Sequence, residues 1–170
     1  MREASGRPWY GGAQRGGKDI MQHDGPVLEA LSGAECLRLL ATVPIGRICY
    51  TRQALPAVEP VNFALSDRTI VIRTDGGGKL AAAIRRAVVA FQADNIDPVR
   101  RSGWSVTVVG RCEDVTDAAE VARLDGLGLE PWAPGIRDHF IRIRPGIVTG
   151  RRLRGAGAPP RREEPKVPSE

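Results

Sequence analysis

The segment Thr74–Lys79 carries the residue types best suited to binding an anion. Three consecutive glycines precede Lys79, and an alanine-rich stretch with high helix propensity follows it. Glycines let successive backbone N–H groups turn toward an anion, and the N-terminal end of a helix adds positive potential. The segment therefore predicts a phosphate-binding turn, with an ordinary strand-to-helix turn as the alternative. It is not a Walker motif, because the spacing of that motif is absent.

Catalytic side chains are harder to identify. The two histidines are His23 and His139, and we expect His139 to be structural, because a lone histidine is more often structural than a base. The three cysteines, Cys36, Cys49 and Cys112, are too widely spaced for a disulfide framework or a zinc site. No hydrolase motif is present and the carboxylates are scattered. We name no catalytic residue and no metal ligand, and expect a bound cofactor to carry the chemistry if the protein is an enzyme.

The elements that must position these residues are mostly short strands. Ser32 and Glu35 form a capping box, which predicts a helix that ends before Pro44. Two further short helices are predicted over Lys79–Arg86 and Asp117–Leu124. The predicted strands are Ile45–Thr51, Ala57–Leu65, Thr69–Thr74, Val88–Ala93, Gly103–Val115 and Asp138–Thr149, the last of them interrupted at Pro145-Gly146.

Glycines inside two of these strands indicate how the sheet is shaped. Gly110 lies within the longest strand, where a glycine often marks a bend or bulge. Gly46 allows the close approach of another backbone. Short strands with one long, bent strand favour a mainly β fold, a closed or nearly closed barrel of about six antiparallel strands with short α-helices. Strands and helices do not alternate regularly, which argues against a Rossmann fold.

The composition describes one globular domain with polar ends. The chain has 170 residues, of which 42% are apolar and 26% charged, with a formal net charge of +5. We expect a disordered leader over residues 1–25, a folded domain over 26–152 and a disordered tail over 153–170. Most of the positive charge falls on the stretch from Arg151 onward, which we expect to be solvated, so nucleic acid is an unlikely partner. The absence of a long apolar run predicts no membrane span. The N-terminus has no apolar run of a secretory signal and the cysteines form no disulfide framework, which predicts a cytoplasmic location.

Four short segments occur in a recognisable order. They are Pro60–Phe63, Ile70–Lys79, Gly103–Arg111 and Ile147–Arg152. Together they resemble the pyridoxamine 5'-phosphate oxidase-like flavin-binding split barrels, and the resemblance covers most of the predicted folded domain. It implies a split β-barrel, a homodimer, and FMN bound at the subunit interface.

The resemblance also implies nine cofactor-binding residues. They are Pro60, Val61 and Asn62 along the isoalloxazine ring, Arg73 and Thr74 beside the ring and ribityl chain, Gly78 and Lys79 at the phosphate, and Trp104 and Ser105 approaching the flavin from the other subunit. The phosphate position implied for Lys79 agrees with the phosphate-binding turn predicted from the residues alone.

Departures from the family pattern restrict the expected activity. Glu59 and Gly78 stand where the true oxidases carry arginines, and Ser105 stands where they carry a glutamine. The C-terminal tryptophan and arginine of the oxidases have no clear counterpart after Gly150. Lysine cannot replace the bidentate phosphate contacts of the lost guanidiniums. We therefore expect an FMN-dependent oxidoreductase with a small-molecule redox substrate that is not a true pyridoxamine phosphate oxidase. The alternatives are a deazaflavin-dependent reductase and a non-catalytic flavin- or haem-binding module.

Overall fold

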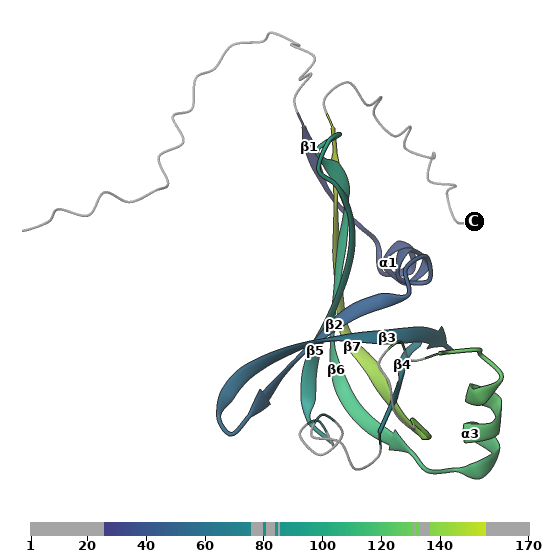
Figure 1. Ribbon diagram of the computed structural model, residues 1–170. Helices are drawn as coiled ribbons and strands as arrows, with labels where there is room; N and C mark the ends of the chain where they lie inside the picture. The colour runs from purple at the N-terminus through teal and green to yellow at the C-terminus, as the bar shows by residue number, and fades with distance from the viewer. Residues whose placement is uncertain are drawn as a thin grey trace, which may run out of the picture.

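The computed structural model describes residues 26–75, 80, 84, 86–130, 132 and 137–155. This part of the chain forms one antiparallel sheet with two short helices beside it (Figure 1). The strands are β1 (Val27–Ala30), β2 (Ile45–Arg52), β3 (Leu55–Ser66), β4 (Thr69–Thr74), β5 (Val88–Asp97), β6 (Ser102–Val115) and β7 (His139–Arg154), and the helices are α1 (Gly33–Leu40) and α3 (Ala118–Asp125). None of the helices in these residues is long and apolar enough to cross a membrane.

Six of the strands close into a barrel. The order in the sheet is β1-β7-β4-β3-β2-β5-β6, and an additional pairing of β6 with β7 closes the six strands from β7 to β6, with β1 outside the ring. The register between β6 and β7 shifts at Val109/Gly110. A Cβ on Gly110 would lie 2.1 Å from the Arg144 carbonyl oxygen, so only glycine fits this bulge. The predicted mainly β barrel, with a bend at Gly110, is confirmed.

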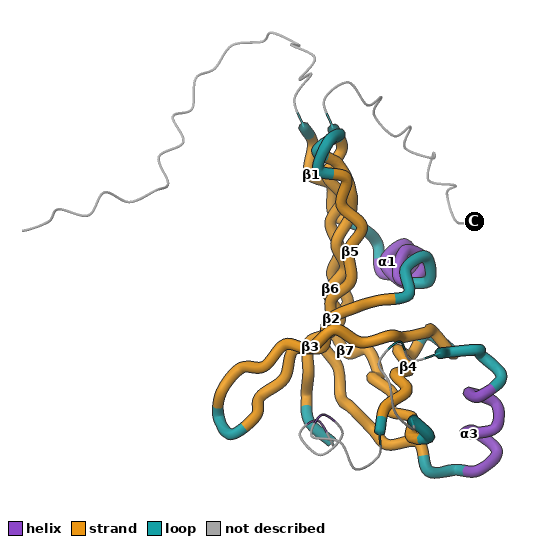
Figure 2. The backbone as a smooth tube through the Cα atoms, viewed as in Figure 1, coloured by secondary structure: helices purple, strands orange, loops and turns teal. Residues whose placement is uncertain are grey.

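A narrow arm extends from the barrel (Figure 2). It is built from β1, the end of β5, the start of β6 and the end of β7. The register places Ile96 opposite Gly103, Gly103 opposite Leu153, and Leu153 opposite Leu28. The barrel and the arm are therefore two ends of the same long strands.

Helix α1 begins and ends where the sequence predicts. The Ser32 side chain accepts a hydrogen bond from the Glu35 N–H at 3.3 Å, and the helix ends at Leu40, before Pro44. The Glu35 carboxylate is nearly buried and lies 2.8 Å from a guanidinium nitrogen of Arg152 on β7. Helix α3 is capped in the same way by Asp117, which accepts from the Glu120 N–H at 2.8 Å.

The barrel interior is filled by aliphatic side chains around two phenylalanines. Phe63 and Phe91 meet edge to face with ring centroids 4.8 Å apart. A Cβ on Gly46 would lie 2.1 Å from the Phe91 ring, so Gly46 makes room for a side chain. The prediction that Gly46 allows the close approach of another backbone is therefore wrong, because the group that approaches is the Phe91 side chain.

Three features differ from the sequence-based prediction. The sequence predicts no strand at β1, and β7 runs without interruption through Pro145-Gly146 to Arg154. The basic stretch that begins at Arg151 is paired strand up to Arg154, two residues beyond the predicted boundary at 152, and is not a solvated tail in that part. The predicted leader, residues 156–170 of the predicted tail, and most of the predicted helix Lys79–Arg86 lie outside the described residues.

Candidate functional site

Strand β3 changes its partner between Asn62 and Phe63. It pairs with β2 over Leu55–Asn62 and with β4 over Phe63–Ser66. Among the described residues, no strand therefore lies along its β4-facing edge before Phe63 or along its β2-facing edge after Asn62. Two backbone edges are thus open at one point of the barrel, on opposite sides of the same strand.

One hydrogen bond fixes the direction of the backbone groups on β3. The Phe63 N–H donates to the Pro44 carbonyl oxygen at 3.2 Å, on the β2 side. Backbone groups alternate in direction along an antiparallel strand, so the Pro60 carbonyl and the Asn62 N–H point to the β4-facing edge. Pro60 has no N–H, which protects this edge from pairing with another strand. The β4-facing edge therefore offers a ligand one acceptor, the Pro60 carbonyl, and one donor, the Asn62 N–H.

The pairing of β3 with β4 brings two groups of predicted site residues together. Phe63 lies opposite Ile72, so Asn62 and Arg73 are neighbours where the two strands separate. Thr74 follows at the end of β4 and is buried. Pro60 and Val61 precede Asn62 on the open part of β3, and the Asn62 side-chain oxygen accepts from the Trp132 N–H at 3.0 Å.

The Arg73 side chain is occupied by contacts within the fold. Its Nε donates to the Arg137 carbonyl oxygen at 2.6 Å, and its terminal nitrogen lies 3.1 Å from the Asp125 carboxylate. The guanidinium also lies over the Phe140 ring, 5.2 Å from the centroid. These contacts tie β4 to the end of α3, so Arg73 can reach the site with its backbone only.

Glu59 has a structural partner. Its carboxylate accepts a hydrogen bond from the hydroxyl of Tyr50, which is nearly buried on β2. Burial, and then the hydrogen bond to Glu59, raise the pKa of Tyr50 above its usual value. The acidic residue that replaces the family's arginine is therefore part of a polar pair between β2 and β3.

The remaining predicted site residues lie elsewhere. Trp104 and Ser105 are in the arm, where they pair with Asn95 and Asp94 of β5, away from the ends of β3 and β4. In one chain they do not meet the residues on β3 and β4. Gly78 and Lys79 lie outside the described residues, as does the predicted phosphate-binding turn.

Sequence reasoning missed Arg137. The register places His139 opposite Thr74, so Arg137 lies just beyond the end of β4. Its Nε is buried and has no hydrogen-bond partner among the described residues. A buried, unpaired guanidinium nitrogen is costly, so this group is a candidate to hold an anion. Arg137 lies outside every recognised motif, so no signal in the sequence could have pointed to it.

The other candidate side chains are structural. The His139 Nε2 lies 3.2 Å from the Asp114 carboxylate, across β6 and β7, which supports the prediction of a structural histidine. Burial raises the pKa of the Cys112 thiol to about 12, so this cysteine is unreactive. Cys49 is half-buried. In the part of the chain that is described, no group of three or more His, Cys, Asp or Glu side chains could hold a metal ion.

Comparison with known proteins identifies the family of this barrel. The family model described as pyridoxamine 5'-phosphate oxidase matches residues 32–152. An uncharacterized protein of Mycobacterium tuberculosis, Rv0080, is 44% identical over 124 residues, which cover 70% of this chain and 81% of the relative.

Solved structures agree with that match. A structure described as the FAD binding protein from Mycobacterium smegmatis is 34% identical, with a TM-score of 0.60, and covers 75% of this chain and 100% of its own. A putative pyridoxamine 5'-phosphate oxidase from Corynebacterium glutamicum is 33% identical, with a TM-score of 0.67, and the match covers 75% of this chain and 99% of that structure's chain. With its closed six-stranded sheet and the match over residues 32–152, the chain belongs to the pyridoxamine 5'-phosphate oxidase-like family of split barrels.

Proposed function

We propose that this protein binds a flavin, with FMN as the first candidate, along the β4-facing open edge of β3. We propose further that it acts as an oxidoreductase on a small-molecule redox substrate. The observation that carries the proposal is the backbone edge at Pro60 and Asn62, which lies beside the end of β4. Relatives support it, since the similar proteins from Mycobacterium smegmatis and Mesorhizobium loti are described as FAD-binding.

The residues of the open edge suit the ring of a flavin. The pyrimidine edge of an isoalloxazine carries an N–H group between two carbonyls. The Pro60 carbonyl can accept from such an N–H, and the Asn62 N–H can donate to a ring carbonyl. Thr74 would adjoin the ribityl chain. A bound flavin supplies hydride transfer, while this chain binds and orients it and shields one face from water.

The phosphate would depend on positive groups beyond the end of β4. Lys79 and the glycine-rich turn are one part of this proposed site. Arg137 is a second part, because its Nε is buried without a partner among the described residues. A guanidinium at this place would offer the phosphate a charged contact of its own. The two arginines that Glu59 and Gly78 replace are still missing, which favours an activity other than oxidation of pyridoxamine phosphate.

The choice of flavin remains part of the proposal. A deazaflavin with an acidic tail would need free basic groups near Arg151 and Arg152. Arg152 is paired with Glu35 and Arg154 with Glu29, each at 2.8 Å, which leaves Arg151 as the exposed arginine of this stretch. This favours FMN over a deazaflavin, and the descriptions of the relatives make FAD the next candidate.

Substitution of Lys79 tests the proposed site. Lys79→Ala should lower the affinity for FMN by roughly ten- to a hundredfold, because a charge-assisted hydrogen bond is worth ~1.5–3 kcal/mol. Riboflavin has no phosphate, so its affinity should change much less. Fluorescence titration of the flavin-free protein with FMN, FAD, riboflavin and a deazaflavin measures both effects, and Lys166→Ala, in the C-terminal segment, is the matched control.

The outcomes separate the candidate functions. Equal FMN affinity in parent and Lys79→Ala, or an equal loss for FMN and riboflavin, would contradict the phosphate role. Flavin binding without turnover under any electron donor would support the non-catalytic carrier. A haem absorbance band in the purified protein, with no flavin bound, would favour the haem-binding alternative.

Location and assembly complete the proposal. All three cysteines lie in the described residues as free thiols, which supports a cytoplasmic location. Trp104 and Ser105 can take their implied place at the flavin only from a second subunit, since in one chain they lie in the arm. We therefore propose a homodimer with the cofactor between its subunits.

A further inference from the structure

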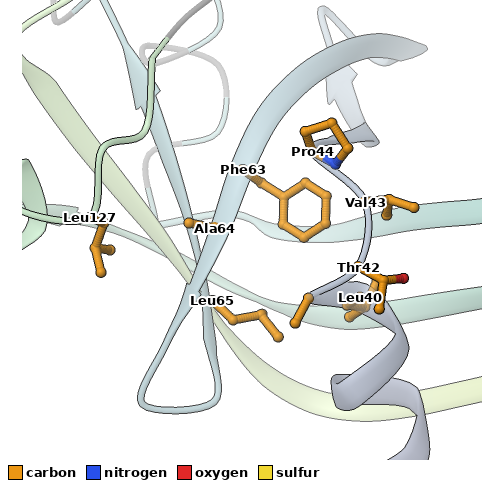
Figure 3. A pocket seen from close by; sticks show the side chains of 9 residues that line it. Leu40, Thr42, Val43, Pro44, Phe63, Ala64, Leu65 and Leu127 are labelled. Atoms are coloured by element: carbon orange, nitrogen blue, oxygen red, sulfur yellow. The ribbon is translucent and has the colours of Figure 1, made fainter.

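We propose that the second open edge of β3 forms a binding site for a neutral, apolar small molecule that carries a hydrogen-bond acceptor. The site is a pocket of about 440 Å³ between the α1–β2 connection and the β2-facing edge of β3 (Figure 3). Phe63 and Leu65 line it from β3, Thr42 and Pro44 from the connection, and Leu127 from the turn after α3. This volume lies in the range of small-molecule sites. The proposal does not rest on flavin binding.

The wall of the pocket formed by the α1–β2 connection offers no hydrogen-bond donor. The Thr42 hydroxyl donates to the Leu39 carbonyl oxygen at 2.6 Å, and the Thr42 N–H donates to the same oxygen at 2.9 Å. The Val43 N–H donates to the Leu40 carbonyl oxygen at 3.4 Å, and Pro44 has no N–H. None of the lining residues is charged. Apart from Thr42, whose hydroxyl is already bonded, every lining side chain is apolar, so the pocket suits a ligand with an apolar body.

The β3 wall supplies one donor. The Phe63 N–H points to the β2 side, where it bonds to Pro44, and backbone groups two residues apart point the same way. The Leu65 N–H therefore points toward the pocket that Leu65 lines, at a position where no strand pairs with β3 on this edge within the described residues. Leu65 is half-buried, and an N–H with no acceptor among the described residues gains most from a ligand oxygen. A carbonyl-type acceptor on the ligand meets that need.

The end of α1 sets the charge of the ligand. Residues Leu40–Pro44 form the C-terminal end of this helix and the turn after it, where the helix dipole gives negative potential. An anion such as a flavin phosphate is disfavoured here. The pocket and the proposed flavin edge also lie on opposite edges of β3, so the two ligands should bind together without competition.

Binding of a neutral dye to the full-length protein tests the site. Ala41 lines the pocket and is exposed, so Ala41→Trp places a large side chain in its mouth without disturbing the core. Nile red, which is neutral and carries a carbonyl, should bind the parent and lose at least ~tenfold in affinity in Ala41→Trp. Ala34→Trp adds the same side chain to an exposed position of the same helix, away from the pocket, and should leave the affinity unchanged. Equal binding by the parent and Ala41→Trp would overturn the proposal.

A second variant tests the pocket independently, in case Ala41→Trp does not fold. Leu127 is 41% exposed, so Leu127→Glu should fold and should weaken Nile red binding by placing a charge in the pocket. Val99→Glu, at a position that is 90% exposed and does not line the pocket, is its control. If Nile red binds Leu127→Glu as it binds Val99→Glu, the site is elsewhere.

The class of ligand is tested with matched probes. Acetophenone should bind more tightly than ethylbenzene in ligand-observed NMR, because only the ketone can accept from the Leu65 N–H, and both signals should weaken in Ala41→Trp. An anionic dye, anilinonaphthalene sulfonate, should bind more weakly than Nile red. Tighter binding of the anion, equal binding of ketone and hydrocarbon, or displacement of Nile red by FMN would contradict the assignment. Failure of FMN to bind at all would overturn the proposed function and leave these dye measurements valid.

Discussion

Arg73 is the residue where a predicted cofactor role and an observed structural role compete. Its guanidinium bonds to the Arg137 carbonyl, pairs with Asp125 and lies over the Phe140 ring. Arg73→Met should therefore lower the free energy of unfolding by about 1–2 kcal/mol, mostly through the charged hydrogen bond, since the exposed ion pair contributes little. Urea unfolding measures the loss. A large drop in flavin affinity with unchanged stability would instead show that the side chain binds the cofactor.

The pair of Tyr50 and Glu59 makes stability depend on alkaline pH. The pKa of Tyr50 is raised in the fold, first by burial and then by Glu59, so the folded state favours the neutral phenol. That contribution is complete below the ordinary tyrosine pKa of about 10 and is lost as the pH rises through the folded value. Thermal unfolding between pH 8 and 12 should therefore show a steeper alkaline decline for the parent than for Tyr50→Phe. Identical declines for the two proteins would contradict a perturbed Tyr50.

At the scale of elements, the bulge between β6 and β7 is the feature that glycine makes possible. A Cβ on Gly110 would meet the Arg144 carbonyl oxygen at 2.1 Å, and backbone cannot move aside as a side chain can. Gly110→Ala should cost about 2–3 kcal/mol of unfolding free energy. Gly33→Ala is the control, because nothing lies within 4 Å of its added Cβ and alanine favours the helix, so it should stabilise by about 0.4–1 kcal/mol. Chemical denaturation compares the two, and a neutral Gly110→Ala would mean that the bulge relaxes.

Elements with a local signal were predictable from the sequence. The capping box of Ser32 and Glu35 indicates α1, and the run of β-branched residues Ile70–Ile72 after a short turn indicates β4 over Thr69–Thr74. Strand β1 has only four residues and no pattern of its own, since its partner β7 specifies it from more than a hundred residues away. Pro145-Gly146 suggested a break in β7, but the register shift opposite it, at Val109/Gly110, lets the strand continue.

The site was predictable only as segments of strand. The strand that carries Asn62 follows from its composition, whereas the change of partner at that residue depends on where β2 ends and β4 begins. The contacts of Arg73 are also tertiary, since they join β4 to residues more than fifty positions away, and the burial of the Arg137 Nε depends on the same packing. Local sequence patterns carry no information about such pairs.

For the whole molecule, the proposed cofactor site needs two copies of the chain. Residues on β3 and β4 and residues in the arm belong to different parts of one chain, so the site we propose would be completed by the arm of a partner. Sedimentation at micromolar concentration should therefore give about twice the chain mass of 18.3 kDa, with and without FMN. A monomer that binds FMN with full affinity would contradict both the homodimer and the implied roles of Trp104 and Ser105.

Strand β7 pairs with β1, β4 and β6, and it is the last strand of the sheet in chain order. During synthesis, the preceding strands leave the ribosome before the strand that closes the barrel exists. A nascent chain that ends before His139 has no partner for β1 and one open side on both β4 and β6. Pairings so distant in sequence form slowly, because the intervening chain must first be ordered. The exposed strand edges of this interval are where a chaperone would be needed, and where a stalled chain would begin to aggregate.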